Sequence, residues 1–315
     1  MIVFGPVPSR RLGRSLGINN IPPKICSYSC IYCQVGRTDQ LRIERAAFYA
    51  PAAVYEAVCQ KVKSAREAGE EIDYLAFVPD GEPTLDVNLG REIDLLRDLG
   101  IKIAVITNAS LLGREEVRSD LAKANWVSLK VDAVEEDIWR RINRPHGRLN
   151  LGDIMEGALR FSRDYSGELT TETMLAAGVN DGEKQLRQIA AFLERIHPKI
   201  AYVSIPTRPP AETWVAPPDE ETLNRAYQIF AAKLTGVELL TGYEGDVFSF
   251  TGNAEEDLLS ITAVHPMREE AVRAFLEKSG DSWLLIQKLL DRGQLAETAY
   301  GGRKYYLRKL PGKMS

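Results

Sequence analysis

Long apolar runs are absent from this sequence. No stretch approaches the roughly 18 residues that a membrane-crossing helix needs. Residues 1–14 are interrupted by Pro6 and Pro8 and lack the apolar segment of a signal peptide. We therefore expect a cytoplasmic protein that has no membrane partner.

An excess of basic charge is also missing. The net charge is −4 over 315 residues, so the whole chain carries no strong signal for nucleic-acid binding, although charge can still be local. Hydrophobic residues are 44% of the chain, which is close to the globular norm and allows a sizeable core. The length suits one large domain with a small one, or two domains of ordinary size.

Cysteine is scarce, but most of it is concentrated in one place. Only four cysteines occur, and Cys26, Cys30 and Cys33 lie within eight residues of one another. In a reducing compartment, clustered cysteines favour metal binding or catalysis over disulfide bonds. Cys59 lies within an expected helix, where we expect it to act as a small buried hydrophobic residue.

Strand-like runs alternate with amphipathic stretches through the first 250 residues. This βα rhythm is typical of a parallel sheet. About six units are too few for a closed eight-unit barrel, so an α/β fold with a partial (β/α)6 barrel fits better. Functional groups should then gather at the C-terminal ends of the strands. The expected strands are residues 14–19, 74–78, 102–107, 126–132, 168–175 and 201–205, and the expected helices are residues 51–68, 88–99, 114–124, 151–164 and 183–196.

The pattern changes after about residue 250. Three helices and a hairpin around Gly301 and Gly302 predict a small winged helix-turn-helix at residues 254–315, beside a barrel domain at residues 1–253. The expected helices are residues 254–263, 268–278 and 282–291, and the expected strands are residues 295–299 and 304–308.

The end of this region is basic and aromatic. From Ala299 onward there is no acidic residue, and three tyrosines alternate with five basic residues: Tyr300, Tyr305, Tyr306, Arg303, Lys304, Arg308, Lys309 and Lys313. Such a wing could contact an RNA backbone and stack on bases. It could also be a solvated hairpin whose rings pack on the helices, or a docking module for a protein or peptide.

The clustered cysteines have the spacing C-x3-C-x2-C. Four-iron clusters usually take four thiolates, so three leave one iron open to a small bidentate ligand that can receive an electron. A structural zinc site or three unconnected thiols is the alternative. Zinc sites usually show paired C-x2-C elements and a fourth ligand, and this sequence has no second pair.

The cysteine motif resembles the signature of the radical S-adenosylmethionine (SAM) superfamily. Together with residues 4–19, 80–85, 130–132 and 142–145, it resembles the branch grouped with the wyosine-tRNA synthases, many of whose bacterial members have no assigned substrate. The resemblance implies that a [4Fe–4S] cluster on Cys26, Cys30 and Cys33 binds SAM and cleaves it reductively. The resulting 5′-deoxyadenosyl radical would abstract hydrogen from an unidentified substrate, which could be tRNA or another RNA, a protein or a peptide. An electron donor such as flavodoxin or ferredoxin is also implied.

The resemblance assigns cofactor contacts near the cysteines. Tyr32 matches the position that contacts adenine. Gly81 and Glu82 match a Gly-Gly-Glu-type segment that binds the methionyl amino group, although Asp80 stands where the commoner form has glycine. An ordinary Pro/Gly/Asp turn is the alternative for this segment.

Further polar residues lie at the ends of the next strands. Ser128, Lys130 and Asp132 alternate, so they share one face of a strand and need partners if that face is the barrel interior. A self-satisfied pair of Lys130 and Asp132 is the alternative. The resemblance implies that these three residues, with Thr107 and Asn108, contact the ribose and carboxylate of SAM. Arg144 could clamp a carboxylate or phosphate.

One feature departs from the wyosine synthases. Those that build the tricyclic base carry a second cluster on additional N-terminal cysteines, and only Cys59 is spare here. We therefore expect a single-cluster enzyme, with no side chain yet assigned to catalysis. A non-catalytic iron–sulfur sensor that binds nucleic acid through its winged helix is the competing hypothesis. Polar residues along the strands favour the enzyme, because a sensor needs no pocket for a second ligand.

Overall fold

The computed structural model describes residues 2–241, 248, 250, 252–264 and 266–309. Lys313 of the basic wing lies outside these residues. Within them, no helix combines the length and apolar character needed to cross a membrane.

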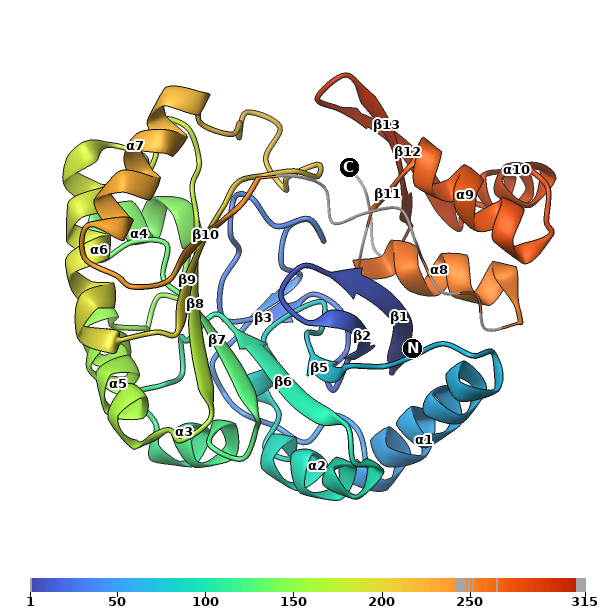
Figure 1. Cartoon of the computed structure of the whole chain (residues 1–315), viewed down its shortest axis with the longest axis horizontal. Coiled ribbons are helices and arrows are strands. Elements are labelled where there is room, and N and C mark those ends of the chain that lie inside the picture. Colours follow the sequence, from blue (N-terminus) through green and yellow to red (C-terminus); the bar gives the residue numbers. More distant parts are fainter. Residues whose placement is uncertain (1, 242–247, 249, 251, 265, 310–315) are drawn as a thin grey trace.

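One curved eight-stranded sheet forms the centre of the chain (Figure 1). Its order is β1-β2-β5-β6-β7-β8-β9-β10, and all neighbours from β2 onward are parallel, whereas β1 is antiparallel to β2. The sheet curls into a half-barrel, which confirms the predicted partial barrel. Its strands are β1 (Val3–Ser9), β2 (Gly13–Ile18), β5 (Tyr74–Phe77), β6 (Lys102–Thr107), β7 (Trp126–Lys130), β8 (Glu168–Met174), β9 (Ile200–Ser204) and β10 (Val237–Leu240).

Helices cover the outer side of the curved sheet (Figure 1). They bury apolar stripes against it, as Val54, Val58 and Val62 of α1 show. Cys59 of the same helix is only half-buried, so its expected full burial is wrong. These helices are α1 (Pro51–Glu67), α2 (Leu89–Leu96), α3 (Glu115–Leu121), α4 (Glu136–Asn143), α5 (Leu151–Asp164), α6 (Glu183–Ile196) and α7 (Glu220–Ala231).

The last part of the described chain forms three helices and a small sheet of order β11-β13-β12. These elements share one hydrophobic cluster with Phe4 and Val7 of β1, so they pack directly on the edge of the half-barrel. Tyr305 and Tyr306 are only 2% exposed, and this burial prevents their rings from stacking on bases. The elements are α8 (Ala254–Val264), β11 (Met267–Arg268), α9 (Glu269–Ser279), α10 (Leu284–Asp291), β12 (Leu295–Tyr300) and β13 (Arg303–Arg308).

Candidate active site

The three clustered cysteines lie in the loop between β2 and α1. Cys26 ends the short strand β3 (Ile25–Cys26), which pairs with β4 (Gln40–Leu41), and all three thiols are half-buried. The side-chain amide of Asn108 lies 3.5 Å from the Cys26 sulfur, and that of Asn143 lies 3.4 Å from the Cys30 sulfur. Amide donors at these positions stabilise negative charge on the sulfur atoms.

The surroundings of the thiols favour their neutral form in the absence of a cation. Burial, followed by the charge of Asp132, raises the pKa of Cys30 to about 12. Burial, followed by the charge of Glu82, raises the pKa of Cys26 well above its ordinary value. A metal that binds these sulfurs must therefore displace protons from them.

The donor set fits an iron–sulfur cluster better than a single metal ion. Among the described residues, no three His, Cys, Asp or Glu side chains are arranged to hold one metal ion. A four-iron cluster differs because each thiolate binds a different iron atom. Three half-buried cysteines on one loop match that requirement, with one iron left without a cysteine ligand.

The loop after β5 packs directly against the cysteine loop. A Cβ atom at Gly81 would lie 2.0 Å from the Ile25 carbonyl oxygen, so only glycine fits there. Two backbone hydrogen bonds join the segments: the Glu82 amide donates to Ile25 at 3.2 Å, and the Lys24 amide donates to Asp80 at 2.6 Å. The absence of a side chain at Gly81 thus allows the loop after β5 to pack closely against the backbone of Ile25, next to Cys26.

Glu82 is the centre of a buried hydrogen-bond network. Its Oε1 accepts from the Thr84 amide at 3.1 Å and from the Thr84 and Thr107 hydroxyls at 2.6 Å each. Its Oε2 accepts from the Asn108 amide at 2.7 Å. Burial raises the pKa of this carboxyl, and the four donors partly oppose that effect. Because Oε2 accepts only one of these bonds, it keeps capacity for another donor.

A cavity of about 340 Å³ opens inside the curved sheet beside Cys33. Tyr32 and Lys130 line it, as do Asp80 and Glu172. Asp80 is buried, and among the described residues its Oδ1 has no hydrogen-bond partner. Burial raises the pKa of Asp80 to about 7. Asp80, which stands where the commoner family form has glycine, therefore places a carboxyl at the cavity, two positions before Glu82.

A group of charged residues lines one wall of the cavity. Lys130 donates to Glu172 at 2.9 Å, Arg11 forms an ion pair with the same carboxylate, and the Ser204 hydroxyl donates to it at 2.9 Å. Burial alone would raise the pKa of Glu172, but the charges of Lys130 and Arg11 outweigh burial and hold that pKa well below its usual range. The alternative pairing of Lys130 with Asp132 is therefore not the arrangement that the structure shows.

Asp132 instead orients Tyr32. The Tyr32 hydroxyl and the Asn143 amide both donate to Asp132 Oδ2, the latter at 2.7 Å, and the Met174 amide donates to Oδ1 at 2.8 Å. The Lys130 ammonium lies 4.9 Å from the centre of the Tyr32 ring, a cation–π contact. These contacts fix the ring beside Cys33.

Two of the predicted cofactor residues lie apart from these groups. Ser128 is fully buried, and no described residue bonds to its hydroxyl. Arg144 ends α4, where it and Arg37 both pair with Glu212. Arg144 therefore pairs with Glu212 and does not line the cavity.

Sequence reasoning missed three polar residues of the site. Glu172 lies at the centre of a strand that is otherwise buried, and a charge at such a position signals a partner. Arg11 follows a proline-broken stretch and gave no periodic signal. Asn143 lay inside a motif quoted for resemblance alone, yet it contacts both Cys30 and Asp132.

Comparison with known proteins agrees with this geometry. Residues 20–192 match the Radical SAM superfamily. A UPF0026 protein of Methanocaldococcus jannaschii is 46% identical over 314 residues, covering 99% of this chain and 97% of its own. The fold resembles a radical SAM methyltransferase from Sphaerobacter thermophilus (TM-score 0.54, 19% identity, 72% of this chain and 66% of that one) and Streptococcus suis SuiB bound to SAM (TM-score 0.52, 14% identity, 71% and 49%). Since the superfamily match spans more than half of the chain and the archaeal relative aligns over nearly its whole length, this chain belongs to the radical SAM superfamily and to the UPF0026 family.

Proposed function

We propose that this chain is a radical SAM enzyme in which Cys26, Cys30 and Cys33 bind a single [4Fe–4S] cluster and SAM occupies the adjoining cavity. Members of this superfamily use both cofactors. The observation that carries the proposal is the position of three half-buried thiols, two of them in contact with amide donors, beside a polar cavity that reaches Cys33. When bound, the cluster supplies one electron that cleaves SAM to methionine and a 5′-deoxyadenosyl radical, which abstracts hydrogen from the substrate.

The roles of the surrounding side chains follow from their charge and position. Glu82 Oε2 has capacity for a bond from the methionyl ammonium, and Asp80 Oδ1, which accepts no hydrogen bond from a described residue, offers a second acceptor. Tyr32 is held by Asp132 at the edge of the cavity, and we assign it to an adenine contact. Lys130, which lines the cavity, supplies positive charge for the SAM carboxylate, and Glu172 keeps it in place.

The remaining predicted residues support these contacts from behind. Thr107 and Asn108 bond to Glu82, and the Asn108 side chain also bonds to Cys26. We assign them to the positioning of the carboxylate and the thiol. The buried Ser128 hydroxyl has no hydrogen-bond partner among the described residues, and Arg144 is held by Glu212, so we assign neither of them a contact with SAM.

The substrate is a macromolecule or peptide in this proposal. Residues 254–315 are a winged helix in this proposal, which the order α8-β11-α9-α10-β12-β13 of their described part supports, and we propose that they dock RNA, protein or peptide near the cavity. Two contacts support that placement: the Tyr300 hydroxyl donates to Pro206 and the Tyr305 hydroxyl to Thr207, both at 3.0 Å. Pro206 and Thr207 line the cavity. A non-catalytic sensor has no use for such a cavity, so the enzyme is the better reading.

The motifs around residues 4–19 and 142–145 support a place beside the wyosine-tRNA synthases. Only Cys59 is left for further metal binding, so we propose one cluster and no auxiliary one. Reduced thiols of this kind persist in the cytoplasm, where we place the protein. An electron donor such as flavodoxin or ferredoxin is then required.

Anaerobic reconstitution tests the proposal. The protein, reduced with dithionite and given SAM, should release 5′-deoxyadenosine, measured by liquid chromatography and mass spectrometry. Cys26→Ala, Cys30→Ala and Cys33→Ala should each abolish this product and the cluster absorbance. The matched control is Cys59→Ala on α1, which should retain both. Wild-type protein that binds a full cluster but never cleaves SAM would refute the enzyme.

A further inference from the structure

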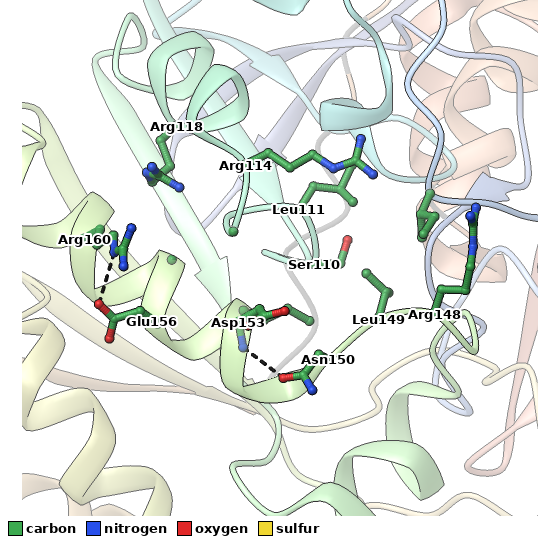
Figure 2. A pocket seen from close by; sticks show the side chains of 14 residues that line it. Ser110, Leu111, Arg114, Arg118, Arg148, Leu149, Asn150, Asp153, Glu156 and Arg160 are labelled. Carbon is green, nitrogen blue, oxygen red and sulfur yellow. Dashed lines mark hydrogen bonds and ion pairs between the residues drawn. The ribbon is translucent and has the colours of Figure 1, made fainter.

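A second cavity, of about 420 Å³, lies on the helix-covered outer side between α3 and α5 (Figure 2). Its walls come from the loop after β6, from the residues before α5 and from α5 itself. Four of its lining residues are arginines and only two are acidic, although the whole chain has a net charge of −4. These six residues are Arg114, Arg118, Arg148, Arg160, Asp153 and Glu156.

The arginines of this cavity differ in how far their charge is already compensated. Arg160 pairs with Glu156 at 3.1 Å, and Arg148 pairs with Glu44. Arg118 donates to the Leu112 carbonyl at 2.7 Å and forms no ion pair with a described residue. Within the described part of the chain, the Arg114 guanidinium has neither a hydrogen-bond partner nor an ion pair. The cavity therefore keeps net positive charge for an acidic ligand.

Three hydrogen bonds lead from the cavity wall to the Cys26 sulfur. Ser110 lines the cavity, and its hydroxyl lies 2.6 Å from that of Ser27. The Asn108 side-chain amide lies 2.9 Å from the Ser27 hydroxyl and 3.5 Å from the Cys26 sulfur. Ile43 also lines the cavity, and the backbone amide of the preceding residue, Arg42, donates to the Cys26 carbonyl at 3.0 Å. The arginine-lined cavity thus adjoins the outer side of the cysteine loop.

From this geometry we infer that the arginine-lined cavity and its rim are the docking site of an acidic one-electron donor protein of the flavodoxin or ferredoxin class. The inference rests on the proposed function, because it needs a cluster at Cys26. One electron leaves the donor and enters the cluster, so the donor is oxidised by one electron, the cluster is reduced by one, and no bond in the chain is made or broken. Tunnelling slows exponentially with distance, which favours a donor beside Cys26.

The position of the cavity favours a donor over an RNA substrate. A substrate must reach the cavity inside the sheet, which Lys130 and Cys33 line. The arginine-lined cavity shares none of its lining residues with that one. An RNA phosphate on these arginines would therefore sit beside the cysteine loop without access to the reacting groups.

Charge reversal with two reductants tests the inference. The variant is Arg114→Glu with Arg160→Glu, and the matched control is Arg187→Glu on α6, whose i,i+4 pair with Glu183 mirrors that of Arg160 with Glu156. A strongly acidic flavodoxin, reduced in advance, should reduce the cluster of the double variant about tenfold or more slowly at low salt. Dithionite should reduce wild type and both variants at equal rates.

Each other result has a defined meaning. The inference would be overturned if flavodoxin reduces the double variant as fast as wild type, or if dithionite reduction of the double variant slows by the same factor as flavodoxin reduction. A double variant that keeps the wild-type rate with flavodoxin but binds RNA more weakly would assign the cavity to RNA instead. If the double variant fails to fold, Arg114→Ala should still slow flavodoxin while sparing dithionite. Cluster reduction is followed by electron paramagnetic resonance and does not depend on SAM cleavage. If the wild-type cluster is reduced but no 5′-deoxyadenosine is released, the proposed enzyme is refuted, whereas the docking inference is still tested by the reduction rates.

Discussion

The contact between Gly81 and the cysteine loop predicts that Gly81→Ala prevents cluster binding. The added Cβ would lie 2.0 Å from the Ile25 oxygen, whereas ordinary contact begins at 3.4 Å, so the two backbones must separate by about 1.4 Å. The bond from Glu82 to Ile25 would break, and the bond from Lys24 to Asp80 would weaken. Each bond contributes about 1 kcal/mol and overpacking costs about 1–3 kcal/mol. We expect the free energy of unfolding of the apoprotein to fall by about 2–4 kcal/mol.

Urea denaturation of the apoprotein measures that loss, and iron content after anaerobic reconstitution measures cluster binding. Gly147→Ala is the matched control, because Gly147 is exposed and a Cβ there meets no atom within 4 Å. It should change stability by less than about 0.5 kcal/mol and leave the iron content intact. The reasoning is refuted if Gly81→Ala unfolds within about 1 kcal/mol of wild type and still takes up a full cluster.

Three further predictions concern buried polar groups. Glu172→Gln removes the anion that holds Lys130, so we expect 5′-deoxyadenosine formation to slow about tenfold or more while iron content stays unchanged; an unchanged rate would exclude this role. Asn143→Ala removes the donor at the Cys30 sulfur, so spectroelectrochemistry should show a more negative cluster potential, and a more positive one would contradict this. Burial, followed by a neighbouring acid, raises the pKa of Glu92 from its usual 4.5 to about 9. Between those two pH values the Glu92 carboxyl keeps its proton in the folded chain and loses it in the unfolded chain. The unfolding free energy of wild type should therefore fall with rising pH by about 1.4 kcal/mol per pH unit more than that of Glu92→Gln, as measured by urea titrations at pH 6 and 8. Equal slopes for the two proteins would contradict the prediction.

The parallel strands were predictable because they are short apolar runs between turn residues, and all six expected ones occur in the sheet. β1 was missed because Pro6 and Pro8 interrupt it. Proline is tolerated at a sheet edge, where backbone donors can remain unpaired, and β1 is an edge strand. β10 has only four residues, and its place in the sheet depends on parallel pairing with β9. Sequence periodicity does not reveal such a pairing.

The site was predictable where its residues are close in sequence and hidden where they are not. The thiols of Cys26, Cys30 and Cys33 share one loop, so their spacing alone indicated a cluster. Glu172 and Arg11 are 161 positions apart, and only the closure of β1, β2 and β8 around one cavity pairs them. A charge pattern read along a single strand offered only Asp132 as a partner for Lys130, whereas Glu172, with which Lys130 pairs, lies on the neighbouring strand.

The two cavities share no lining residue, and this separation has a consequence for the order of events. The inner cavity is bordered by Pro206 and Thr207, which accept hydrogen bonds from Tyr300 and Tyr305 of the C-terminal elements. A substrate docked on those elements would therefore stand at the rim of the SAM cavity while the arginine-lined cavity stays uncovered. An electron donor on the arginines and a substrate on the C-terminal elements would not compete for surface. If the proposed function holds, the cluster could then be reduced after the substrate has bound, so that the radical would form only in a filled cavity.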